Sequence, residues 1–348
     1  MKRRTLCYIL ICFLLMTVVS RIVAQPNPEI LEDRRKLGQT GLQYLTVPVD
    51  PRGSALAGAM TAFEGSSTSL FYNPASMAGV ESFAHVSIAQ SKWIADINYN
   101  QASAAIQPLN GRYGVFGLSF LAVDYGTIRE TIRYDNDQGY LDVGNFSPAA
   151  LSIGLGYAIE LTNMFSVGGQ AKYVSQDLGQ SVMSVVSGDG GESYDRKENN
   201  VSAIAFDFGI LYKTGYKSLN FAMSVRNFAK DLTYEREEFQ LPLTFQVGVA
   251  MNMLDFTDAD KDVHSLLLSV DASHPRSYSE QLKIGVEYTL LNLLSLRAGY
   301  RFPMDEPELN FGLGVHQRIS GVGVGLDYGY SDFGIFEGVQ RFSAQFSF

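Results

Sequence analysis

Nine charged residues lie on one face of segments in which apolar and polar residues alternate. They are Lys172, Asp207, Arg226, Asp271, Lys283, Glu287, Arg297, Arg301 and Asp327. Five are basic and four are acidic, so ion pairs can form between neighbouring segments. The set could be a ladder of structural ion pairs, or it could line a path for binding or transport. The sequence favours the ladder and leaves the path open.

Metal and cofactor chemistry is not expected. The histidines show none of the spacings that metal ligands share; they are His85, His264, His274 and His316. Asp258, Asp260 and Asp262 alternate like the start of a calcium loop. The glycine and the distal glutamate of such a loop are missing, and Ser269 stands at the glutamate position. We therefore predict a solvated turn at this place.

Catalysis is not expected either. Gly-x-Gly pairs such as Gly154 with Gly156 lie inside alternating segments and not between a strand and a helix. They therefore do not predict a phosphate-binding loop. No grouping of Ser, His and Asp residues suggests a nucleophile.

The charged residues must be positioned by β-strands, because apolar and polar residues alternate from Ser82 almost to the end of the chain. The period of two predicts fourteen strands, near residues 83–90, 95–107, 113–125, 149–160, 165–176, 201–213, 219–228, 242–253, 264–272, 281–290, 293–302, 308–318, 321–330 and 339–348. An even number places both ends of a ring on one side. With that side in the periplasm, the long polar loops 126–146, 177–200 and 229–241 lie outside, as in outer-membrane barrels.

The two faces of these segments favour a membrane barrel over a soluble β-sandwich. In 201–213, Ile204, Phe206 and Phe208 share one face, and Ala205 and Asp207 lie on the other. A sandwich also alternates, but large apolar residues opposite small ones fit a lipid-facing wall around a narrow lumen. Charges facing lipid are costly, so the nine charged residues are expected to point inward.

The first 24 residues are predicted to be a secretory signal. Basic residues at 2–4 precede an apolar run over 6–19, which is short for a membrane span. Cys7 and Cys12 would leave with the signal, so we expect no disulfide and no cysteine-bound metal. Cleavage would change the formal charge from −9 to −13, which does not suit a nucleic-acid partner.

Residues 25–81 are predicted to form a periplasmic lead-in, mostly irregular over 25–45, followed by a plug inside the barrel. Asp50 can cap a short helix that begins at Pro51. Small residues over 54–62 would let a wall approach this helix closely. The alternative is an amphipathic helix outside a soluble β-domain. The candidate plug residues are Arg52, Asn73, Pro74 and Ala75.

Several motifs, taken in order along residues 38–348, resemble the PorV/PorQ family of outer-membrane proteins. They are Gly38-Gln39-Thr40, Leu45 to Pro48, Arg52 with the small-residue helix, Tyr72-Asn73-Pro74-Ala75, Trp93 to Tyr99, Leu161 to Gly168 with Lys172-Tyr173, and Arg226-Asn227-Phe228. The last strand, in which Phe342, Phe346 and Phe348 alternate with polar residues, resembles the signal that the outer-membrane assembly machinery reads.

This resemblance implies both a fold and a function. The family is similar to the FadL fatty-acid channel, a fourteen-stranded barrel with an N-terminal hatch. Its members act in the type IX secretion system. PorV-like members receive cargo from the translocon by the C-terminal signal domain of the cargo, and PorQ-like members support the attachment complex.

We therefore expect an all-β, 14-stranded antiparallel transmembrane β-barrel in the bacterial outer membrane. Its domains would be a signal peptide (1–24), a lead-in and plug (25–81) and the barrel (82–348). Its outer loops would bind secreted cargo or partner subunits, with no cofactor and no enzymatic activity. The alternatives are a FadL-like channel for hydrophobic small molecules and a barrel with a purely structural role.

Overall fold

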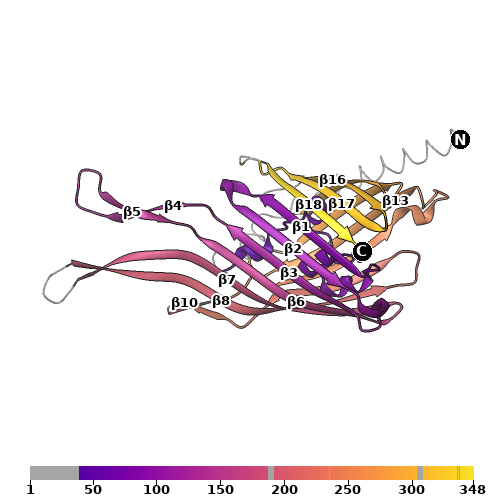
Figure 1. The fold of residues 1–348 in the computed structure, drawn as a ribbon, viewed down its shortest axis with the longest axis horizontal. Helices are drawn as coiled ribbons and strands as arrows, with labels where there is room; N and C mark the ends of the chain where they lie inside the picture. The colour runs from indigo at the N-terminus through magenta and orange to yellow at the C-terminus, as the bar shows by residue number, and fades with distance from the viewer. Residues whose placement is uncertain (1–38, 187–191, 235, 304–308, 335, 337) are drawn as a thin grey trace.

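The computed structural model describes residues 39–186, 192–234, 236–303, 309–334, 336 and 338–348. In this part of the chain, fourteen antiparallel strands form a closed barrel, and the last strand pairs with the first (Figure 1). They are β1 (Ala84–Lys92), β2 (Asn98–Ile106), β3 (Val115–Asp124), β6 (Ala149–Thr162), β7 (Phe165–Val186), β8 (Glu192–Lys213), β9 (Asn220–Phe228), β12 (Thr244–Asn252), β13 (His264–Pro275), β14 (Gln281–Leu290), β15 (Leu294–Phe302), β16 (Leu309–Ile319), β17 (Val322–Ser331) and β18 (Val339–Ser347). The predicted class and strand count are confirmed. The predicted signal peptide lies outside the described residues.

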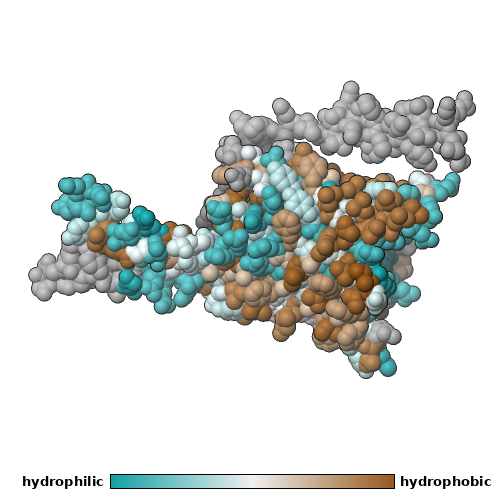
Figure 2. Space-filling view, turned by 45° about the horizontal axis from the view of Figure 1, so that its top comes forward, coloured by the Kyte–Doolittle hydropathy of each residue, from teal (hydrophilic) through white to brown (hydrophobic). Residues whose placement is uncertain are grey.

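The outer surface of the wall is apolar. In β8, Ile204, Phe206 and Phe208 are 40–54% exposed, whereas the alternating Ala205 and Asp207 are at most 1% exposed. Figure 2 shows hydrophobic residues gathered over the barrel wall and hydrophilic ones over the projecting hairpins. Such a wall suits a bilayer, because lipid contacts the apolar side chains and the closed ring pairs the backbone groups.

The long connections contain β-hairpins, where the sequence predicted loops. β4 (Ile128–Arg133) pairs with β5 (Tyr140–Phe146), and β10 (Leu232–Tyr234) pairs with β11 (Glu237–Phe239). β7 and β8 continue past the rim as a third hairpin, seen at the left of Figure 1. The residues of β7 beyond Asp177 pair only with β8, since β6 begins opposite Asp177. Their polarity suggested loops, but a two-stranded ribbon in water pairs its backbone groups without an apolar face.

Residues 42–80, which we call the inner segment, lie inside the ring. They contain η1 (Gln43–Thr46), α3 (Pro51–Ala55), η2 (Ser67–Phe71) and η3 (Pro74–Gly79). α3 lies beside β15 to β18, η2 beside β1 to β3, and η3 beside β6 to β8. The wall therefore surrounds the inner segment on most sides. None of the described helices is long and apolar enough to cross a membrane.

Local capping explains why the inner segment folds as short turns. Asp50 accepts a hydrogen bond from Gly53 N at 2.8 Å, and Pro51 is the first residue of α3. Asn73 accepts from Ala75 N at 3.1 Å and begins η3 in the same way. Each cap satisfies backbone donors that would otherwise be buried without a partner.

The chain enters the barrel at the end that carries the long hairpins. Gly41 N donates to Gln240 O at 3.0 Å, and Thr40 Oγ1 lies 2.5 Å from Ser277 Oγ. Gln240 and Ser277 both belong to connections at that end. The sequence placed residues 25–45 at the opposite, periplasmic end, so the described residues 39–45 differ from this prediction. The remaining lead-in residues, 25–38, lie outside the described part.

Glycines let the wall approach the inner segment. A Cβ at Gly168 of β7 would lie 2.5 Å from Ala75 N, and one at Gly299 of β15 would lie 2.5 Å from Ala57 N. These are backbone atoms, which cannot move as the end of a side chain can. The wall is therefore fitted to the inner segment at these places.

We expect Gly168→Ala to destabilise the barrel by about 1–3 kcal/mol, because the added methyl group overlaps the backbone of η3. Gly169→Ala is the matched control, since a Cβ there would meet its nearest atom at 3.5 Å. Urea unfolding of the refolded barrel, followed by its mobility on unheated gels, measures the difference. Equal midpoints for the two variants would show that the inner segment does not lie against β7.

Candidate functional site

The lumen holds a chain of ion pairs that joins α3 to the wall. Arg52 donates to Glu287 of β14 through Nε at 2.9 Å and through a terminal nitrogen at 2.7 Å. Arg297 of β15 lies between Glu287 and Asp327 of β17, at 2.5 Å from each carboxylate. Gln345 donates to the second oxygen of Asp327 at 2.8 Å. Every carboxylate here has at least one cationic partner, as buried charges require.

A second cluster joins three strands on the opposite wall. Lys172 Nζ of β7 lies 2.7 Å from Asp207 Oδ2 of β8 and 2.6 Å from Asn227 Oδ1 of β9. Asn227 N donates to the other oxygen of Asp207 at 2.6 Å. All three residues are at most 9% exposed. This cluster ties the wall strands β7, β8 and β9 to each other.

Asp271 of β13 has a different partner from the one its register suggests. It lies opposite Lys283 in the β13–β14 ladder, yet the structure shows no ion pair between them in the described part of the chain. Its Oδ2 accepts from Thr61 N at 3.0 Å and from Thr61 Oγ1 at 2.6 Å. Asp271 therefore holds the inner segment through Oδ2, while its Oδ1 makes no hydrogen bond and its charge acts on Lys283 across the ladder without a close ion pair.

Four of the nine predicted residues belong to neither cluster: Asp271, which Thr61 holds, and three cations. Arg226, Lys283 and Arg301 line a cavity of about 620 Å³ at the hairpin end of the lumen, which we call the chamber. Arg226 donates to Phe71 O and lies over the ring of Tyr72, 6.0 Å from its centroid. No ion pair involves any of the three cations within the described ranges. The nine residues thus comprise five in the two ion-paired clusters, Asp271 bound to Thr61, and three cations without an ion pair among the described residues.

The four predicted plug residues lie in the inner segment. Arg52 makes the contact with Glu287 given above. Asn73 is fully buried, and its Nδ2 donates to Thr61 O at 2.9 Å and to Ile210 O of β8 at 3.1 Å. Pro74 begins η3, and Ala75 packs against Gly168. These residues position the inner segment, and none of them lines the chamber.

Sequence reasoning missed Arg341. This residue of β18 is 1% exposed; its Nε donates to Pro48 O at 2.9 Å and its terminal nitrogen to Ser331 Oγ at 2.8 Å. Its guanidinium also lies 5.4 Å from the ring centroid of Trp93. The alternation of the last strand, which places Ser343 inward, also places Arg341 inward and could have identified it.

The acidic turn at the opposite end, after η6 (Met253–Phe256), holds itself together by hydrogen bonds. Asp260 Oδ1 accepts from Asp262 N at 3.0 Å. Hydrogen bonds from Lys261 and Ser218 lower the pKa of Asp255 to about 2. Within the described residues, no three His, Cys, Asp or Glu side chains are grouped to hold a metal ion.

The chain matches one family model over residues 139–339, and that family is described as type IX secretion system membrane protein PorP/SprF. The matched part runs from β5 to the start of β18. No curated protein sequence matches the chain significantly. The family match supports the expected link to type IX secretion, and it does not show the PorV/PorQ family specifically.

Solved structures with the same fold include two toluene transporters and a FadL homologue. The Ralstonia pickettii toluene transporter TbuX has a TM-score of 0.57 at 14% identity, covering 86% of this chain and 98% of its own. The Pseudomonas putida toluene transporter TodX has a TM-score of 0.54 at 12% identity, and the match covers 86% of this chain and 96% of TodX. A Pseudomonas aeruginosa FadL homologue has a TM-score of 0.53 at 12% identity, and the match covers 87% of this chain and 98% of the homologue. At these identities the likeness establishes a FadL-like barrel fold and nothing about a ligand.

We expect Arg297→Gln to lower the free energy of unfolding by about 3–5 kcal/mol, because it leaves two buried carboxylates without their shared cation. Arg129→Gln is the control, since Arg129 pairs with Asp142 at 3.4 Å on an exposed hairpin. That variant should lose less than about 1 kcal/mol. Urea titrations of both variants in the same vesicles give the comparison, and similar losses would contradict a structural role for the buried chain.

Proposed function

Because the chain belongs to the PorP/SprF family of type IX secretion system membrane proteins, we propose that it binds secreted cargo or partner subunits of the secretion complex at the cell surface. It is an outer-membrane β-barrel with a FadL-like fold. The proposal adds the place of binding, which is the set of hairpins beyond the rim.

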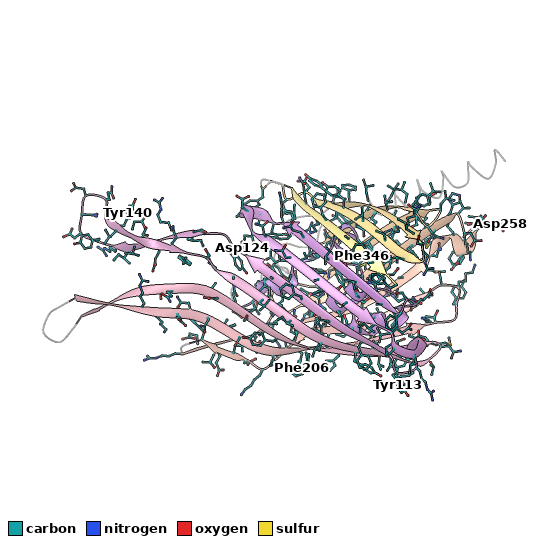
Figure 3. All side chains as sticks on the ribbon, in the orientation of Figure 1. Tyr113, Asp124, Tyr140, Phe206, Asp258 and Phe346 are labelled. Atoms are coloured by element: carbon teal, nitrogen blue, oxygen red, sulfur yellow. The ribbon has the colours of Figure 1, made fainter. Side chains whose placement is uncertain are left out.

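The observation that carries this proposal is the pair of long hairpins at one end of the barrel. The part of β7 beyond Asp177 extends roughly 30 Å at the usual rise of a strand. The β4–β5 hairpin exposes Tyr134, Tyr140 and Leu141 by 43–48%. Figure 3 places Tyr140 on this hairpin, far from Asp258 at the opposite end. Exposed aromatic and aliphatic side chains beyond the lipid belt are typical of protein-binding surfaces.

A finer assignment follows from the motifs that resemble the PorV/PorQ family. A PorV-like role would make the translocon and the C-terminal domains of cargo its partners, and a PorQ-like role would make the attachment complex its partner. The motif residues Asn73 and Arg226 hold the inner segment against the wall, and these contacts support the hatch that the resemblance implies. The activity we propose is binding and not catalysis. We also propose that the signal peptide is cleaved after residue 24, which would leave a mature chain made of the lead-in and plug (25–81) and the barrel (82–348).

A channel for hydrophobic small molecules is the weaker alternative. Such a channel calls for an apolar route between the inner segment and the wall. The ion pairs of Arg52 with Glu287 and the hydrogen bonds of Thr61 with Asp271 cross that boundary instead. The chamber at the hairpin end is lined by three unpaired cations, which disfavour a neutral hydrocarbon.

A deletion of residues 128–146 tests the proposal. Thr127 Oγ1 and Ser147 Oγ lie 3.3 Å apart, so the two ends can be joined without moving β3 or β6. We expect the shortened barrel to fold and to lose partner proteins when it is purified from native membranes, with partners identified by mass spectrometry.

The control carries Asp258→Asn and Lys261→Gln in the turn at the opposite end and should keep every partner. Recovery of the bare barrel from the unchanged chain, or an identical partner set for the deletion, would overturn binding through the β4–β5 hairpin.

A further inference from the structure

The chamber is a space in the lumen that the proposed function does not use. Residues 46–48 of the inner segment line it, together with residues from the hairpin end such as Trp93 and Ser277. A smaller cavity of about 70 Å³ lies beyond this stretch and shares the lining residues Arg226, Lys283 and Arg301. The combined space falls in the range of ordinary small-molecule sites, about 300–1,000 Å³.

The charge of the lining is strongly one-sided. Arg226, Lys283 and Arg301 line both cavities, and Lys172 lines the smaller one. Among the described residues, no Asp or Glu lines either cavity. The whole chain carries a formal charge of −9, so this local excess of cations opposes the general composition. Low-dielectric walls focus such a field on any anion that enters.

The cations of the chamber are also short of partners. Lys283 is 9% exposed and makes no close ion pair with Asp271, its cross-strand neighbour on β13, whose Oδ2 accepts two hydrogen bonds from Thr61. Arg301 is its other cross-strand neighbour, so two like charges face each other across the β14–β15 ladder. The Nε of Arg301 is buried with no hydrogen-bond partner in the described structure. Buried cations in this state gain stability from a bound anion.

The side of the chamber opposite the cations is aromatic. Trp93 packs edge-on against Phe333, with ring centroids 4.9 Å apart, and against Tyr99 at 5.9 Å. These three rings line the chamber together with Tyr125 and Tyr44. A ligand that fits both sides has an anionic group at one end and a flat or compact apolar body at the other.

We propose that the chamber binds a small organic carboxylate, with its carboxylate on Lys283 and Arg301 and its apolar body against the aromatic side. The proposal does not depend on the secretion role, because it concerns the lumen and not the hairpins. It gives a binding role to Arg226, Lys283 and Arg301, the three cations that take no part in the structural ion pairs.

Trp93 makes the test specific, because it is the only tryptophan of the chain and it lines the chamber. The mature full chain in a non-ionic detergent is titrated with benzoate, and tryptophan emission is recorded. We expect a saturable change with benzoate and none with benzamide, its neutral counterpart of nearly the same shape. Lys283→Gln and Arg301→Gln should each raise the dissociation constant for benzoate at least tenfold.

Lys92→Gln is the control for net charge, since Lys92 is exposed on the outer face of β1, and it should keep the benzoate constant within twofold. An equal response to benzamide, or unchanged benzoate binding in both chamber variants, overturns the proposal. Competition by inorganic phosphate at a lower concentration than benzoate overturns the organic class and leaves a simple inorganic anion site. Loss of partner proteins in the hairpin deletion is a separate result, so the two proposals fail independently.

Discussion

The structure depends on the ion pairs that cross from the inner segment to the wall. The charged groups that hold the inner segment inside the lumen are buried, and buried charges must be paired. Within the wall, Arg297 lies between Glu287 and Asp327 and gives each carboxylate a cation at 2.5 Å. Arg52 extends the same chain to α3. The polar lumen and the apolar outer surface both follow from the bilayer, because lipid offers no partner to a charged or polar group and such groups must pair inside the barrel.

Small residues complete this arrangement. Glycines such as Gly168 and Gly299 let backbone approach backbone, which brings the ion-pairing side chains within reach of the inner segment. The inner segment needs no long helix as a result, since its turns are capped by its own side chains at Asp50 and Asn73. Packing and electrostatics therefore point to the same fold.

The strands, their faces and the inward charges could be predicted from the sequence, because a period of two is set by the backbone and needs no knowledge of partners. The partners themselves could not. Asp271 and Lys283 are neighbours in register, but Thr61, from a distant part of the chain, takes the carboxylate. Polar residues beyond Asp177 read as a loop, although they pair as a hairpin in water. The entry of the chain near Gln240 depends on a long-range backbone contact with no local signal.

The seam between β1 and β18 has a consequence for biogenesis. The inner segment directly precedes β1, and the ring closes only when β1 meets the final strand. Once sealed, the ring could take up this segment only by threading a free chain end past the buried ion pairs. In the simpler order of events, the strands assemble around the inner segment first, and β1 then pairs with β18 to close the ring. Insertion into the membrane and filling of the lumen would then be a single step, and a newly made protein would never expose an open pore to the cell.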